Sequence, residues 1–270
     1  MARRAIEARL ERLVREHRVT IAVVFPLIGA VTLVASAAGL LPDSLSFNAS
    51  LLLIGTLVMR LPLVGTLAPL FDRRAAAWFG LLVSYAYVIE YVGVRTGWPY
   101  GEFTYTVALG PMVGGVPLGL PVFFVPLVVN AYLLALLLTQ GRRGTLPLAL
   151  GLVLAIDLVL DPAAVAIGFW AYPTAGVYYG VPASNYLGWL LAGTVGVVVV
   201  DRAFDRTALS ERLGAAEFAL DDLVSFVLLW GTVNALYAQW MPVAIVGVLG
   251  IGLIRINRFD LPRVPSIAPR

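Results

Sequence analysis

Eight long apolar segments dominate this chain of 270 residues. Each is long enough, or nearly long enough, to cross a bilayer, because a transmembrane helix needs roughly 20 apolar residues. The sequence therefore predicts an all-α fold, a polytopic integral membrane bundle of about eight transmembrane helices. The last two segments can alternatively form one hairpin. The segments lie at approximately 19–41, 47–70, 75–95, 118–139, 145–168, 184–201, 219–238 and 241–256.

The composition supports a membrane protein. Hydrophobic residues make up 60% of the chain and charged residues only 13%. Soluble domains are nearer 45–50% apolar and about 25% charged. A water-soluble globule is therefore excluded.

The arginines fix the expected orientation. If there are eight spans, 17 of the 19 arginines fall on one side, and only Arg60 and Arg95 do not. Loops rich in arginine face the cytoplasm, so both termini are expected there. We therefore predict a multi-pass protein of the cell membrane that contacts membrane lipid and no nucleic acid.

Three regions follow from this pattern. Residues 1–18 alternate arginine and glutamate around apolar residues at helical spacing, which predicts an amphipathic cytoplasmic arm lying on the membrane surface. Residues 19–256 form the expected transmembrane catalytic domain. Residues 257–270 form a cytoplasmic tail.

Missing residue types restrict the chemistry. The chain has no cysteine, which excludes disulfides, thiolate catalysis, iron–sulfur clusters and zinc–sulfur sites. Its one histidine, His17, lies in the charged arm, so a multi-histidine metal site is not expected. It also has no lysine, which excludes a retinal Schiff base. We predict no metal and no cofactor.

Two connections lie on the side of the membrane opposite the arginine-rich loops, at 96–117 and 169–183. Both are almost uncharged and rich in glycine, proline and aromatic residues. Such a composition is typical of an interfacial aromatic belt. It fits equally well a folded cap over a cavity.

Ionisable and amide side chains inside the spans are the main functional candidates, since such groups are costly in a bilayer. The alternating topology places them between the midplane and the outer face, where they can line one cavity. The alternative is that two aspartates only pair with arginines and hold the bundle together. The candidates are Glu90, Asp157 and Asp161, with Arg60, Arg95, Asn130 and Asn234.

Asp157 and Asp161 are four residues apart, so a helix presents both on one face. Pro162 removes a backbone donor and displaces the carbonyl of Leu158, so it is expected to loosen the helix between them. Burial and a neighbouring carboxylate both favour the protonated form of a carboxylic acid. One such group can then donate a proton while an ionised neighbour accepts one, which is general acid–base catalysis. Nearby aromatic faces would stabilise a carbocation.

Seven short motifs follow one another along the chain: EYVG at 90–93, TGWPYGEFTY at 96–105, GVP at 115–117, DLVLDP at 157–162, GFWAY at 168–172, GVYYGVP at 176–182 and NYLGW at 185–189. In this order they resemble archaeal members of the CruF family of membrane carotenoid hydratases. The resemblance implies addition of water to the terminal carbon–carbon double bonds of a long acyclic carotenoid, converting bisanhydrobacterioruberin into bacterioruberin. It also implies a lipophilic carotenoid substrate and other carotenoid-pathway enzymes as partners.

The catalytic roles stay open between three carboxylates. We expect Asp157 or Asp161 to donate the proton and the other to activate water, with Glu90 as the third candidate. The residues expected to position substrate or water are Asn130, Asn185, Tyr91, Arg60, Arg95, Tyr100, Tyr105, Trp170, Tyr178, Tyr179 and Trp189.

Three other functions fit parts of the sequence. A membrane polyprenyl transferase would use the DxxxD pattern of Asp157 and Asp161, but no second Asp-rich motif accompanies it. A carotenoid cyclase would also protonate a double bond, yet would not capture water. A proton-coupled transporter would use the same carboxylates, although the halves show no inverted repeat.

Overall fold

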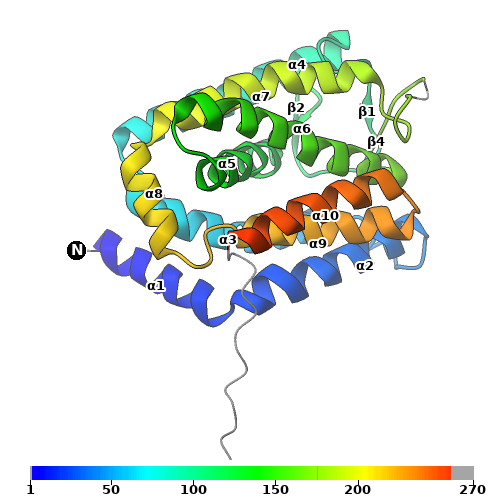
Figure 1. The fold of residues 1–270 in the computed structure, drawn as a ribbon. Coiled ribbons are helices and arrows are strands. Elements are labelled where there is room, and N and C mark those ends of the chain that lie inside the picture. The colour runs from blue at the N-terminus through cyan, green and yellow to red at the C-terminus, as the bar shows by residue number, and fades with distance from the viewer. Residues whose placement is uncertain (1, 175, 257–270) are drawn as a thin grey trace, which may run out of the picture.

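A computed structural model describes residues 2–174 and 176–256 as a bundle of helices (Figure 1). The expected all-α architecture is confirmed. The helices are α1 (Ala2–Glu16), the π-helical segment Thr20–Val24, α2 (Phe25–Ala37), α3 (Ala49–Leu67), the 3₁₀ turn Ala68–Leu70, α4 (Arg73–Thr96), α5 (Leu120–Leu138), α6 (Arg142–Ala166), α7 (Ala183–Ala203), α8 (Arg206–Ala215), α9 (Asp221–Leu236) and α10 (Trp240–Arg255).

Six helices of the described chain are long and apolar enough to cross a membrane. They begin at Thr20, Ala49, Arg73, Leu120, Arg142 and Ala183, close to the first six expected segments. The chain is therefore a multi-pass membrane protein. The expected seventh and eighth spans are α9 and α10, with only 16 residues each. At 1.5 Å per residue such a helix reaches about 24 Å, less than the bilayer core of about 30 Å.

Local sequence signals explain where several helices begin and end. The Asn48 side chain accepts hydrogen bonds from the first backbone amides of α3, and Asp72 and Asp205 cap α4 and α8 in the same way. Helix α4 ends at Thr96, and the next residue, Gly97, has a φ of 74°, the left-handed conformation that glycine adopts without strain.

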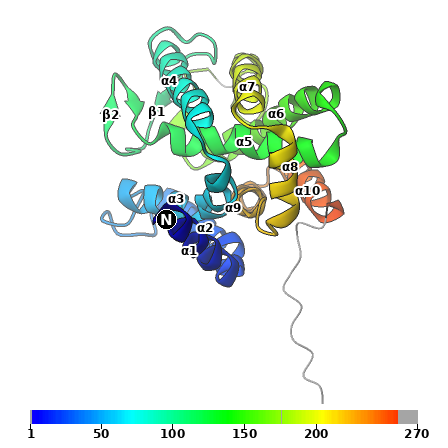
Figure 2. The ribbon, with the colours of Figure 1, turned by 90° about the vertical axis from the view of Figure 1, so that its left-hand side faces the viewer.

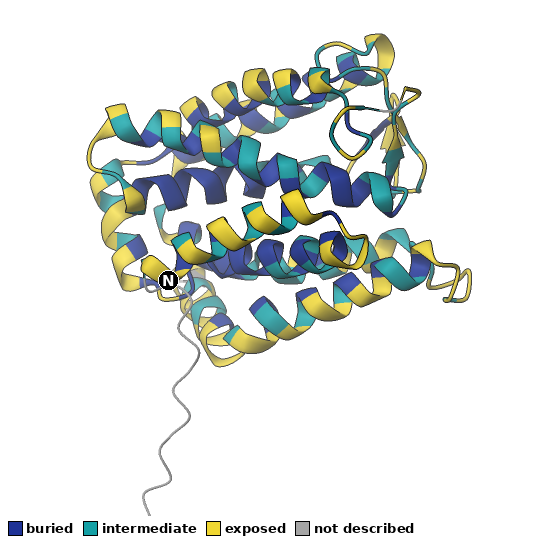
Figure 3. Cartoon of the chain, turned by 45° about the vertical axis from the view of Figure 1, so that its right-hand side comes forward, coloured by how far each residue is buried: buried dark blue, intermediate teal, exposed yellow. Residues whose placement is uncertain are grey.

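The helices pack in two groups, seen end-on in Figure 2. One group contains α4, α5, α6 and α7, and the other contains α1, α2, α3, α9 and α10. Helix α5 is the most enclosed, since its side chains from Phe124 to Leu136 are all buried except Val125. The outward faces of the other helices are exposed in Figure 3, as expected for apolar surfaces that meet lipid.

The two aromatic connections pair with each other, so they form a folded cap. Strand β1 (Thr104–Tyr105) runs antiparallel to β4 (Trp170–Ala171). The Thr106 amide also donates to the Phe169 carbonyl oxygen at 3.0 Å. A second short ladder joins β2 (Met112–Val113) to β3 (Val116–Pro117).

The amphipathic arm is helical, as expected, and packs along α3. Its Arg3 guanidinium donates to the carbonyl oxygens of Ala68 and Phe71, both at 2.8 Å. Helix α8, which the hydropathy pattern did not predict, follows in the loop after α7. The expected tail at 257–270 lies outside the described residues.

Candidate active site

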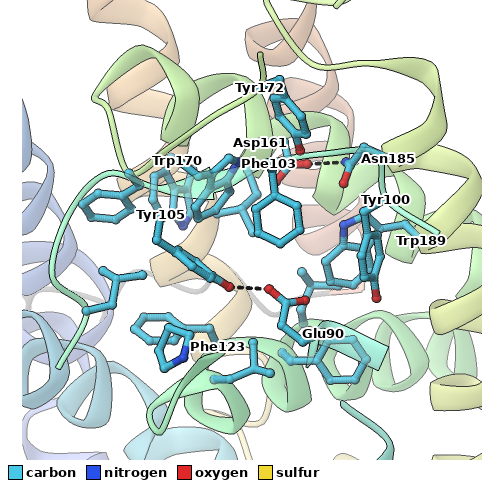
Figure 4. Close-up of a pocket in the computed structure, with 18 residues that line it drawn as sticks. Glu90, Tyr100, Phe103, Tyr105, Phe123, Asp161, Trp170, Tyr172, Asn185 and Trp189 are labelled. Carbon is cyan, nitrogen blue, oxygen red and sulfur yellow. Dashed lines mark hydrogen bonds between the residues drawn. The ribbon is translucent and has the colours of Figure 1, made fainter. Parts of the chain in front are cut away.

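A cavity of about 130 Å³ lies where α4, α5, α6 and α7 meet the strands of the cap (Figure 4). Ten of its 18 lining residues are aromatic, and two are acidic. Its walls therefore suit an apolar molecule that meets a few carboxyl groups. The lining residues are Glu90, Tyr100, Phe103, Tyr105, Leu109, Pro117, Leu120, Phe123, Phe124, Leu127, Leu160, Asp161, Phe169, Trp170, Tyr172, Asn185, Trp189 and Trp230.

Glu90 projects from α4 into the cavity, where the Tyr105 hydroxyl of β1 donates to its Oε1 atom. Burial, followed by the nearby charge of Glu90, raises the pKa of Tyr105 well above its ordinary value. The phenol therefore stays a donor at physiological pH. One carboxylate oxygen of Glu90 is engaged by this bond, so the other can accept a proton.

Asp157 and Asp161 share one amide, which confirms that they lie on the same face of α6. The Nδ2 atom of Asn185 donates to Asp161 Oδ2 and to Asp157 Oδ2, the latter at 3.2 Å. Both aspartates are buried, but only Asp161 lines the cavity. Asp157 is one helical turn away and reaches the site through Asn185.

Tyr172 was missed as a candidate from the sequence. Its hydroxyl points toward Asp161 in Figure 4, and burial raises the pKa of Tyr172 far above its ordinary value. The sequence did contain a signal for Tyr172, because it follows Trp170, an expected substrate residue, by two positions in an extended segment. Alternate residues of such a segment face the same side.

Helix α6 runs unbroken through Pro162, contrary to the expected loosening. Proline removes its own backbone hydrogen bond and crowds the carbonyl of the residue four positions before it. Two amides from the neighbouring group of helices support the carbonyl oxygens around it. Asn234 Nδ2 donates to the Val159 oxygen at 2.9 Å, and Gln239 Nε2 donates to the Pro162 oxygen at 3.2 Å.

Aromatic contacts shape the wall between α5 and α7. Trp189 stacks on Phe124 with ring centroids 5.5 Å apart, and Tyr100 lies tilted against the same indole at 6.3 Å. Tyr105 meets Trp170 edge-on across the paired strands. Four of the residues expected to position the substrate therefore line the cavity, namely Tyr100, Tyr105, Trp170 and Trp189.

The structure places Arg60 and Asn130 outside the cavity lining. Both side chains bind Asp222 of α9, and the Arg60 Nε atom also donates to the Val122 oxygen at 3.2 Å. The Arg95 guanidinium lies 5.3 Å from the ring centre of Tyr91, on the exposed surface. Within the described residues, no ion pair joins Arg60 or Arg95 to Asp157 or Asp161. The structure therefore does not show the alternative in which the two aspartates only pair with arginines to hold the bundle together.

Tyr178 and Tyr179 also lie outside the cavity lining. They belong to the loop before α7, where their rings meet edge-on at 5.0 Å. The Tyr179 hydroxyl accepts a hydrogen bond from the Met241 amide at 3.3 Å.

Among the residues that the structure describes, no group of three histidine, cysteine or acidic side chains is arranged to hold a metal ion.

Residues 47–253 match the family described as "Carotenoid biosynthesis protein". The chain belongs to this family. It is also 58% identical to the bisanhydrobacterioruberin hydratase of Haloarcula japonica over 258 residues, which cover 94% of this chain and 88% of the relative. The resemblance predicted from the seven motifs is thereby confirmed.

No solved structure matches the chain significantly. The region shared with the carotenoid biosynthesis protein family includes every residue that lines the cavity.

Proposed function

We propose that this chain is a membrane carotenoid hydratase that converts bisanhydrobacterioruberin into bacterioruberin by adding water to each terminal double bond. One observation carries this proposal. An aromatic cavity holds Glu90 on one side and Asp161 on another, as Figure 4 shows. The apolar end of a carotenoid can lie between these two carboxyl groups. The 58% identity to a bisanhydrobacterioruberin hydratase supports the same reaction for this chain.

The reaction requires one proton donor and one proton acceptor. Asp161, in its protonated form, gives its proton to the less substituted carbon of the double bond, which leaves a tertiary carbocation. Aromatic faces stabilise this positive charge. Water attacks the cation through its oxygen, and Glu90 takes the proton that the water loses. The net change is addition of one H₂O to each double bond.

The geometry favours Asp161 over Asp157 as the donor, because only Asp161 reaches the cavity. Asn185 holds both carboxyl groups in place through its amide. The Tyr172 hydroxyl, pointing toward Asp161, is placed to orient it further. Asp157 acts as the second member of the pair and exchanges protons with Asp161.

Labelled water tests the reaction. Membranes containing the protein, incubated with the anhydro-carotenoid in H₂¹⁸O, should yield product that has gained one or two labelled oxygen atoms. A cyclase would leave the product mass unchanged. A prenyl transferase would add carbon and would lose activity in EDTA. Product without ¹⁸O would overturn the hydratase.

The close approach of Tyr100 to α7 provides a second test, at Gly188. A Cβ atom there would lie 2.4 Å from Tyr100 Cδ1 and 3.1 Å from the backbone carbon of Pro99. Gly188→Ala must therefore displace the Tyr100 ring at the cavity wall. A shift of about 1 Å in an active site can cost about 10²-fold, so we expect kcat/KM for hydration to fall by that order.

Gly247→Ala is the matched control, since nothing lies within 4 Å of a Cβ atom there. It makes the same chemical change on α10 and should leave kcat/KM unchanged. Equal rates for the two variants would show that the Tyr100 wall does not shape the site.

A further inference from the structure

Within the described chain, Asp157 and two tyrosines, one on α7 and one in the loop before it, carry buried polar atoms without partners. Within residues 2–174 and 176–256, Asp157 Oδ1 and the hydroxyls of Tyr178 and Tyr186 are buried and have no hydrogen-bond partner. Leaving such a group unsatisfied costs free energy, and folded proteins commonly satisfy it with ordered water. The three groups therefore indicate positions that suit water molecules.

The two tyrosines mark a route from the Asp157–Asn185 contact toward the surface. Tyr186 follows Asn185 on α7, and the Asn185 amide donates to Asp157 Oδ2 at 3.2 Å. Its ring meets the Tyr178 ring edge-on, with centroids 5.9 Å apart. Tyr178 in turn contacts Tyr179, which is 37% exposed.

The route is separate from the substrate cavity. Asp157, Tyr178 and Tyr186 are all absent from the residues that line the cavity. Burial raises the pKa of Tyr178 to about 12. Its hydroxyl therefore keeps its proton and can both donate to water and accept from it.

The proposed function makes such a route necessary, and the inference depends on it. Each hydration takes a proton from Asp161, while the proton lost by water goes to Glu90. Asp161 must regain one proton from solvent and Glu90 must release one before the next turnover. An apolar substrate that fills the cavity would keep bulk water from Asp161 on that side.

We propose that Tyr178 and Tyr186 hold a chain of water molecules that carries protons from the loop at 176–182 to Asp157 and thence to Asp161. One proton enters by this route in each turnover, and one leaves from Glu90, so the net charge of the site is restored. Both tyrosines are positioning residues, because they act through water and Asp157 and do not touch the substrate.

Tyr186→Phe and Tyr178→Phe test the route, since each removes one hydroxyl and keeps the ring. We expect steady-state hydration to slow about 10²-fold in each variant, the lower end of the range of proton-transfer effects. Single-turnover hydration, with enzyme in excess over carotenoid, should keep the wild-type rate, because Asp161 starts protonated. Imidazole, a small proton carrier, should restore steady-state turnover.

Tyr237→Phe makes the same change at a 38% exposed tyrosine just after α9 and should leave both rates unchanged. Wild-type steady-state rates in both test variants would overturn the route. Single-turnover rates that fall as much as steady-state rates would also overturn it. Wild-type product that lacks ¹⁸O would instead overturn the proposed function itself.

Discussion

Asp161→Asn should lower the rate of hydration about 10³-fold, the middle of the range that general acid catalysis contributes. Asparagine has nearly the same size as aspartate but carries no acidic proton. The double bond would then lie in the cavity without a donor strong enough to protonate it. The measurement is the rate of ¹⁸O incorporation per amount of protein in the membrane.

Two further variants show whether this loss is specific. Asp43→Asn makes the same change at an exposed position of the loop before α3 and should keep the full rate. Asp157→Asn should slow hydration less than Asp161→Asn, because Asp157 does not reach the cavity. Normal rates in Asp161→Asn would rule out Asp161 as the donor.

The membrane architecture could be predicted from the sequence because its signals are local. Apolar runs of helical length appear directly in the chain, and the four-residue spacing of Asp157 and Asp161 places both on one face of α6. The depth of Glu90 and Asp161 within their spans indicated that they are functional candidates. The structure brings these two into one cavity.

The partner of Arg60 could not be predicted in the same way. Asp222 lies 162 residues away in the sequence, near the start of the expected span 219–238, where it resembles a residue at a helix end. The short helix α9 begins at Asp221 and holds the Asp222 side chain fully buried. Such a pairing depends on how α3 and α9 pack, and no local pattern reports it.

The Arg60–Asp222 ion pair leads to the largest expected effect on stability. Arg60→Met would leave the Asp222 carboxylate, with no solvent exposure, without its positive partner. Breaking a buried pair by removing one member costs about 3–5 kcal/mol, so the free energy of unfolding should fall by that amount. Thermal unfolding of the purified protein in detergent, read by circular dichroism, measures the loss.

The double variant Arg60→Met/Asp222→Leu distinguishes loss of the pair from loss of packing. It removes both charges, so its free energy of unfolding should exceed that of Arg60→Met alone. Arg95→Met is the matched control, because this exposed guanidinium lies over the Tyr91 ring, a contact that contributes about 0.5–1 kcal/mol. Equal losses at Arg60 and Arg95 would contradict the ion pair. A double variant less stable than Arg60→Met would show instead that the Asp222 carboxylate contributes mainly through its hydrogen bond from Asn130.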